Sequence, residues 1–324
     1  VGAVAYSWGF STEPIAGITP IEEMLRVGDR VGAPRAPGAT TTGSAPSAAF
    51  GALTDPTALA PFFERRAAAL AAAVPAGARA SIPISVSGLS RAGFATIAPW
   101  FRDVGLDPVQ APGGSRADTG PTTLEPGSAI GVKLVRGDVE MTATGTVTAV
   151  DGDRVLAFGH PLFGIGDVDL PMTTARVETL LPSLMQSSRL ASAAREVGVL
   201  RQDRAAAVAG RLGGAASMIP VRVQYADGAG SRHTFRFDVA EDPLLAPLLV
   251  YASLNGLLAR HDRGFGDASI RIADGSVIKL DGQDDVALDN LFSGPEATGY
   301  ATGTTAYILH LLLNNDWKPP RVLG

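Results

Sequence analysis

The residues best suited to chemistry lie in one stretch, 155–172, where an apolar run ends at His160 and a loop rich in glycine and proline follows. A strand that presents an imidazole to a loop is a rigid mount for a general base. Asp167 and Asp169 follow His160 closely, and carboxylates there would orient the imidazole or bind a cation. A turn residue is the favoured interpretation for both, since aspartate after glycine stabilises turns. The pattern leaves two alternatives open, a catalytic base or an ordinary strand end.

Other reactive motifs are missing from the sequence. The chain has no cysteine, no His-Glu-x-x-His motif and no Gly-x-Ser-x-Gly motif, and none of its lysines follows a glycine-rich loop. Gly164-Ile-Gly166 lacks the third glycine of a dinucleotide-binding loop. We therefore expect no cofactor and no metal, and the sequence offers a plausible base without a plausible nucleophile. The other histidines read as a strand residue, a helix cap and a packing residue: His233, His261 and His310.

Composition narrows the class of protein. A net charge of -5 and a pI of about 5.4 argue against a nucleic-acid partner, because phosphate binding needs a basic face. An apolar fraction of 46% in 324 residues is enough for a sizeable core, and no apolar run is long enough to span a bilayer. The frequent glycines and prolines predict many turns and short strands.

The elements that must position His160 are strands. In 141–150, threonines alternate with small apolar residues, and Asp151-Gly152 then predicts a hairpin turn into a strand over 154–159. The leucine spacing predicts a helix over 177–195. Further strands are expected over 196–202, 205–212, 219–225 and 233–239.

Elements on both sides of this β region are also predicted. Residues 1–6 read as a strand, with an amphipathic piece near Ile21, Met24 and Leu25. Aspartate followed by proline, at 55 and again at 242, predicts helices over 56–74 and 244–260. The first of these helices is expected to pack on a strand at 81–87. The remaining predictions are a hairpin at Asp274-Gly275, joining strands 269–273 and 276–280, and a last helix over 304–313.

One resemblance adds to this reading. Asp153-Arg-Val-Leu-Ala-Phe-Gly-His160, followed by the glycine-containing runs 197–200 and 209–212, resembles the SpoIVB-type serine peptidase family, in which a Gly-His pair at a strand end supplies the catalytic base. Residues 1–6 look like the strand that follows the family's serine segment. The resemblance covers about residues 1–27 and 125–225. It implies that this chain is a fragment that begins after the nucleophile.

The resemblance carries specific expectations. The predicted elements indicate a mainly β protein with several helices and a C-terminal α+β extension, and the resemblance implies that its β part is a partial trypsin-like double β-barrel. It also implies an extracytoplasmic serine endopeptidase acting on protein or peptide substrates, with His160 as general base and Asp169, or Asp167, replacing the family's usual acid. This fragment alone would be inactive. The expected units are the end of the serine-bearing barrel (1–27), a linker (28–54), an α+β connecting segment (55–124), the histidine-bearing barrel (125–230) and the extension (231–324).

A second hypothesis belongs to another class. The chain would be a non-catalytic β-rich module that binds or scaffolds at the cell envelope, with the apolar helices 244–260 and 304–313 available for docking. A parent gene without a serine segment before Val1 would favour this hypothesis.

Overall fold

The computed structural model describes most of the chain and shows a mainly β protein with several helices. The described residues are 2–8, 15–32, 61–62, 65, 68, 82–103, 105–111, 120–181, 188–228, 230–259, 267–315, 317 and 320–324. The predicted linker 28–54 lies mostly outside these residues, as does the helix predicted over 56–74, of which residues 61, 62, 65 and 68 are described and helical.

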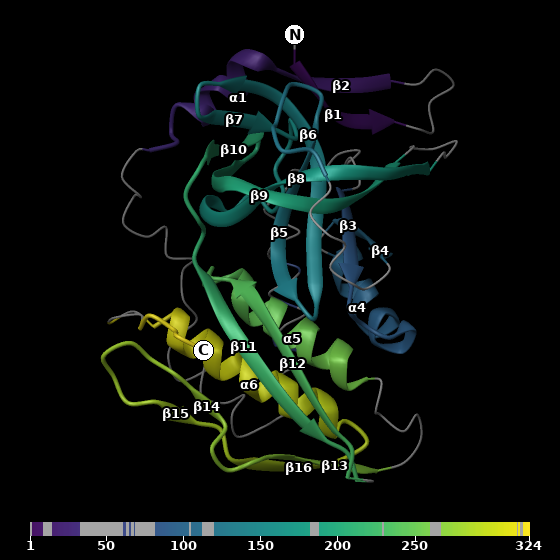
Figure 1. Ribbon diagram of the computed structural model, residues 1–324, viewed down its shortest axis with the longest axis vertical. Helices are drawn as coiled ribbons and strands as arrows, with labels where there is room; N and C mark the ends of the chain where they lie inside the picture. Colours follow the sequence, from purple (N-terminus) through teal and green to yellow (C-terminus); the bar gives the residue numbers. More distant parts are fainter. Residues whose placement is uncertain are drawn as a thin grey trace.

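A large sheet organises the molecule (Figure 1). Its strand order is β11-β12-β5-β8-β9-β10-β7-β6-β3-β4, and β5 also pairs with β6. This additional pairing closes β5, β8, β9, β10, β7 and β6 into a ring, because each of these strands then has two paired neighbours. The strands are β3 Ile82–Ser87, β4 Leu106–Gln110, β5 Ala129–Gly137, β6 Glu140–Asp151, β7 Arg154–Ala157, β8 Gly166–Leu181, β9 Ser188–Arg204, β10 Ala207–Leu212, β11 Met218–Ala226 and β12 Arg232–Ala240.

The expected pair of barrels is not confirmed. Within the described residues a single ring of strands closes, and the N-terminal strands β1 (Gly2–Trp8) and β2 (Ile15–Pro20) form a separate two-stranded hairpin. The strand prediction for residues 1–6 is confirmed. Helix α1 (Ile21–Gly28) follows β2 and buries Met24 and Val27 against Leu156, Ala207 and Ala209 of the ring, which fixes the hairpin beside β7 and β10.

The helix predicted over 177–195 is wrong. The structure has two long antiparallel strands there, β8 and β9, paired from Gly166 opposite Asp203 to Leu181 opposite Ser188. The leucine spacing fits a helix, but it carries no information on hydrogen bonds to a distant strand. Because β8 and β9 pair along most of their length, these residues adopt the extended conformation instead. Residues 182–187, between the two strands, lie outside the described part of the chain.

Strands β3 and β4 pair in parallel and are connected by helix α4 (Arg91–Asp103). The sequence patterns above did not predict this helix. Ser90 caps this helix, because its Oγ accepts a hydrogen bond from the Gly93 amide at 3.1 Å. The packing predicted between helix 56–74 and strand 81–87 stays a prediction, because most of that helix lies outside the described residues. Among its described residues, the ring of Phe62 meets that of Tyr307 edge-on, with centroids 4.7 Å apart.

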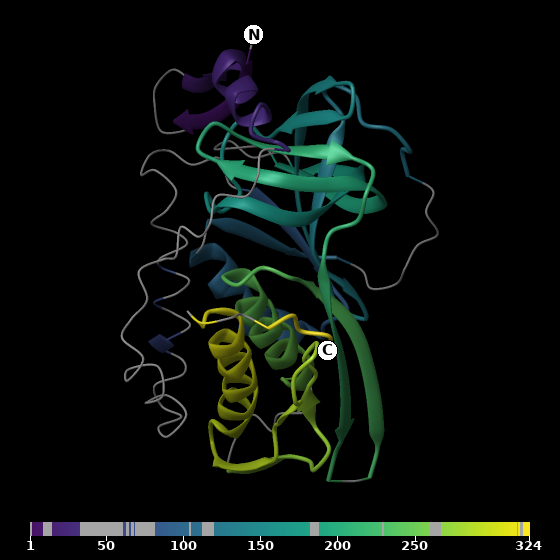
Figure 2. The ribbon, with the colours of Figure 1, turned by 90° about the vertical axis from the view of Figure 1, so that its left-hand side faces the viewer.

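In the C-terminal part, one helix lies against the ribbon of strands β11 and β12, and a second helix packs on the first (Figure 2). Asp242 caps α5 (Leu245–Leu258) as predicted, accepting hydrogen bonds from the amides of Leu244 at 2.8 Å and Leu245 at 3.0 Å. Most residues of α5 are buried, and so are most residues of α6 (Ala297–Leu313). These apolar helices therefore form core, which removes the docking surface that the binding hypothesis drew on.

The hairpin predicted at Asp274-Gly275 is wrong in its pairing. A turn does occur there, closed by the Ser276 amide and the Ala273 carbonyl at 3.1 Å. The strands beside it pair elsewhere, because β13 (Ala268–Ile272) pairs with β16 (Asn290–Gly294) and β14 (Val277–Ile278) pairs with β15 (Val286–Ala287).

Candidate functional site

The candidate site begins at the end of β7, where the backbone turns sharply. The Gly159 amide donates to the Ala157 carbonyl at 2.9 Å, which closes a three-residue turn around Phe158. Phe158 has a φ of +70°, and every other described residue with a positive φ is a glycine. A bulky side chain in this region is strained, and such strain persists where the surrounding structure imposes it.

The ring of Phe158 is the anchor of this turn. Its side chain is only 5% exposed, and its amide donates to the Thr146 carbonyl at 3.0 Å. The ring lies over Gly145, where an added Cβ would be 2.6 Å from Phe158 Cε2. Glycine at position 145 of β6 therefore makes the space that the strained turn requires.

The turn presents His160 in a half-buried position. The Nδ1 atom lies 2.9 Å from the Pro161 carbonyl oxygen, and the ring meets that of Phe158 edge-on at 5.6 Å. A carbonyl only accepts, so Nδ1 carries the proton and Nε2 keeps its lone pair. Burial lowers the pKa of His160, with the Pro161 hydrogen bond acting in the opposite direction. A neutral imidazole with a free Nε2 lone pair is the form that acts as a general base.

The N-terminal hairpin lies directly against this turn. Thr19 Oγ1 donates to the Gly159 carbonyl at 2.6 Å, and Ala3 packs on Gly159 so closely that no side chain fits there. Gly159 also has a φ of +76°, which favours glycine for a second reason. Residues far apart in the sequence thus meet beside His160.

The two aspartates singled out from the sequence face other partners. Asp169 pairs with Arg201 at 2.7 Å and accepts from the Ser217 amide at 3.0 Å, while Asp167 pairs with Arg204 at 2.7 Å. Within the described part of the chain, the His160 ring bonds to the Pro161 carbonyl instead. The geometry therefore does not support Asp169 or Asp167 as the group that orients the imidazole. Both carboxylates are taken up by arginines on β9, the strand beside their own.

A carboxylate that the sequence reasoning missed lies behind the His160 loop. Asp203, on β9, has no exposed surface, and its oxygens accept from the amides of Leu162 at 2.8 Å, Phe163 at 2.7 Å and Gly164 at 2.9 Å. Burial raises its pKa to about 6, although the amides of this loop act in the opposite direction. In the sequence Asp203 stands among Arg201, Gln202 and Arg204, which gives no sign that its side chain is buried.

His233 and His310 occupy a strand and a packed helix, as the sequence predicted. His233 stacks beside Phe235 with centroids 6.4 Å apart on β12, and His310 packs near Phe62 at 4.9 Å. His261 lies outside the described residues.

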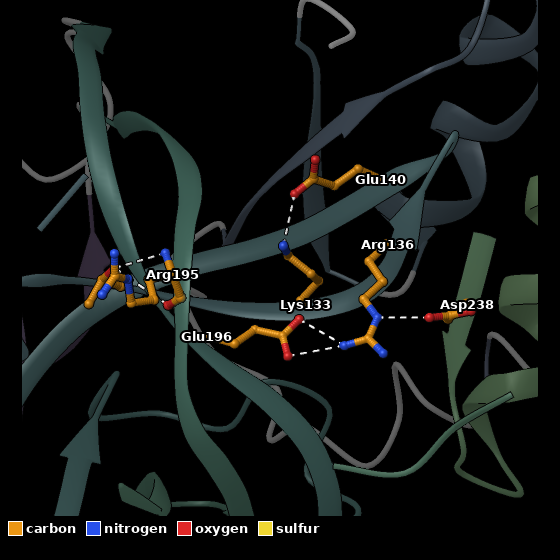
Figure 3. A network of polar contacts seen from close by, with 7 residues as sticks. Lys133, Arg136, Glu140, Arg195, Glu196 and Asp238 are labelled. Carbon is orange, nitrogen blue, oxygen red and sulfur yellow. Dashed lines mark hydrogen bonds and ion pairs between the residues drawn. The ribbon is translucent and has the colours of Figure 1, made fainter. Parts of the chain in front are cut away.

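A separate polar network ties the ring to the ribbon (Figure 3). Arg136 on β5 contacts both oxygens of Glu196 on β9, at 3.0 and 3.1 Å, and Asp238 on β12 at 2.8 Å. Lys133 on the same strand pairs with Glu140 at 3.4 Å. These side chains are partly exposed and already paired across strands, so their role is to hold strands together.

No group of three or more histidine or acidic side chains in the described part of the chain is arranged to hold a metal ion. None of the described helices is both long and apolar enough to cross a membrane. Comparison of the chain with protein-family models, curated proteins and solved structures gave no match. The motif and the geometry at His160 are therefore the features from which a function can be inferred.

Proposed function

We propose that the protein is an extracytoplasmic serine endopeptidase of SpoIVB-like type, with His160 as the general base and the nucleophilic serine supplied from upstream sequence. The single observation that carries the proposal is the strained turn at Phe158, which holds a half-buried histidine with Nδ1 bonded to a carbonyl. Strained backbone is concentrated at functional sites, and a fixed tautomer is what a general base needs. In this proposal the closed ring corresponds to the histidine-bearing barrel of the family.

The chemistry would be acyl transfer. His160 Nε2 would take the proton of the serine hydroxyl as the serine oxygen attacks the substrate carbonyl, and would return that proton to the leaving amine. The lowered pKa of His160 keeps the ring neutral, and so ready to accept a proton, at physiological pH. The contact of the N-terminal hairpin with Gly159 supports this arrangement, because it places Ala3, near the start of the described chain, beside the residue that precedes the histidine.

The test uses the chain expressed together with its natural upstream segment. Hydrolysis of a labelled casein, and self-cleavage, are compared for the wild type, for His160→Ala and for His233→Ala, a histidine from another strand. We expect His160→Ala to lose activity by a factor of about 1,000 or more and His233→Ala to retain it. Equal hydrolysis by the wild type and His160→Ala would remove His160 from the mechanism. That result would favour the hypothesis of a non-catalytic envelope module, even though the helices proposed for its docking are buried.

A further inference from the structure

One peptide group connects the buried carboxylate of Asp203 to the imidazole of His160. The carbonyl of Pro161 accepts from His160 Nδ1 at 2.9 Å. The amide of the same peptide group, on Leu162, donates to Asp203 Oδ1 at 2.8 Å. The two hydrogen bonds therefore run in series through a single planar unit, with the carboxylate at one end and the imidazole at the other.

Hydrogen bonds in series strengthen one another. A negative charge on the N–H side of a peptide group polarises the group and makes its carbonyl oxygen a better acceptor, and this effect is large where water is excluded. Asp203 has no exposed surface, and its second oxygen is held by the amides of Phe163 and Gly164. The carboxylate therefore has little freedom to turn away from Leu162.

We propose that Asp203 is the positioning acid of His160, acting through the Pro161–Leu162 peptide group in the place where a serine peptidase has a direct carboxylate contact. The proposal rests on the proposed role of His160 as general base. When Nε2 takes up a proton the imidazole becomes a cation, its Nδ1–H bond to Pro161 strengthens, and the charge of Asp203 opposes the new positive charge. No proton reaches Asp203, because the Leu162 amide keeps its own.

Asp203 differs from the two aspartates that the sequence suggested. Asp167 and Asp169 each pair with an arginine, whereas the ion pairs in the described part of the chain include none with Asp203. The cross-strand neighbours of Asp203, Gly166 on β8 and Val208 on β10, are uncharged. Its negative charge is therefore directed toward the loop that carries the His160 contact.

The test measures the proton affinity and tautomer of His160 by ¹⁵N NMR in this chain. We expect a wild-type ring protonated at Nδ1. In Asp203→Asn we expect the affinity of His160 for a proton to fall by about threefold or more, because a nearby negative charge is removed. Asp167→Asn and Asp169→Asn remove the same charge from the neighbouring strand and are expected to leave His160 unchanged.

The sign of the change separates this proposal from a purely structural role. If Asp203 only holds the loop, its replacement loosens the loop, exposes His160 and relieves the burial that disfavours the charged ring, so the proton affinity rises. A rise, or no change, in folded Asp203→Asn would overturn the proposal. The result is independent of peptidase activity, so a failure here leaves the assay of His160→Ala to judge the function separately.

A second measurement applies if Asp203→Asn does not fold. In the wild type, the ¹³C signal of the Asp203 carboxyl is titrated together with the Leu162 amide and His160 Nδ1 signals. We expect both nitrogen-bound protons to follow the Asp203 midpoint. A carboxyl that titrates while His160 Nδ1–H does not respond would contradict transmission through the peptide group.

Discussion

The strain at Phe158 gives a prediction whose sign is opposite to the usual one. At ordinary positions alanine is more stable than glycine by about 0.5–1 kcal/mol, because glycine loses more conformational freedom on folding. The φ of +70° at Phe158 reverses this preference, since a side chain in the left-handed region costs about 1–2 kcal/mol. We therefore expect Phe158→Gly to be more stable than Phe158→Ala by about 0.5–1 kcal/mol. Both variants lose the buried ring, which costs about 3–5 kcal/mol relative to the wild type.

The assay is urea unfolding followed by circular dichroism, with the free energies of unfolding of the two variants compared directly. Ala157→Gly serves as the matched control, because Ala157 is the preceding residue, lies in β7 and is 1% exposed. There we expect glycine to be the less stable residue by about 1 kcal/mol or more. If Phe158→Ala proves at least as stable as Phe158→Gly, the backbone at this position is not left-handed. Backbone strain would then not mark the turn before His160 as a functional site.

Three further predictions test other parts of the molecule. Because the pKa of Asp203 is raised from 3.8 to about 6, its stabilising effect is greatest below pH 4 and falls as the pH rises through 6. The free energy of unfolding of the wild type should therefore fall relative to that of Asp203→Asn by up to about 3 kcal/mol between pH 4 and 7. A difference that stays constant with pH would contradict the raised pKa. Gly145→Ala places a methyl group 2.6 Å from Phe158 Cε2, so urea unfolding should show a loss of about 1–3 kcal/mol; an unchanged midpoint would mean that the ring does not lie there. Gly93→Ala would drive its Cβ into the carbonyl of Gly256 where α4 meets α5, and calorimetry should show a melting temperature lowered by several degrees, whereas an unchanged value would place the helices further apart.

Local signals predicted much of the region around the site. The alternating threonines and the Asp151-Gly152 turn gave β6 and β7 with nearly correct ends, because a half-buried strand and a tight turn both depend on neighbouring residues. The Asp242-Pro243 pair gave the start of α5 for the same reason. The position of His160 shortly after a strand was also predicted, since an apolar run stops at glycine there; the strand itself ends at Ala157, two residues earlier than predicted.

Predictions that depend on distant partners were less successful. The helix predicted over 177–195 became parts of β8 and β9, because each strand supplies the hydrogen-bond partners of the other. The turn predicted at Asp274-Gly275 is present, but the strands on either side of it pair with β16 and β15 and not with each other. Asp169 was the acid candidate because it is close to His160 in sequence, yet it turns to Arg201 on the neighbouring strand.

The sequence by itself determined that a strand ends just before Gly159-His160 and that glycines and prolines shape the loop behind it, because those features follow from local backbone preferences. The tertiary structure alone decided what surrounds the imidazole. Closure of the ring through β5 and β6 and the pairing of β8 with β9 carry Asp203 beneath residues 162–164, and α1 fixes the N-terminal hairpin against Gly159. A buried carboxylate needs several hydrogen-bond donors in a place from which water is excluded, and only the folded chain provides such a place.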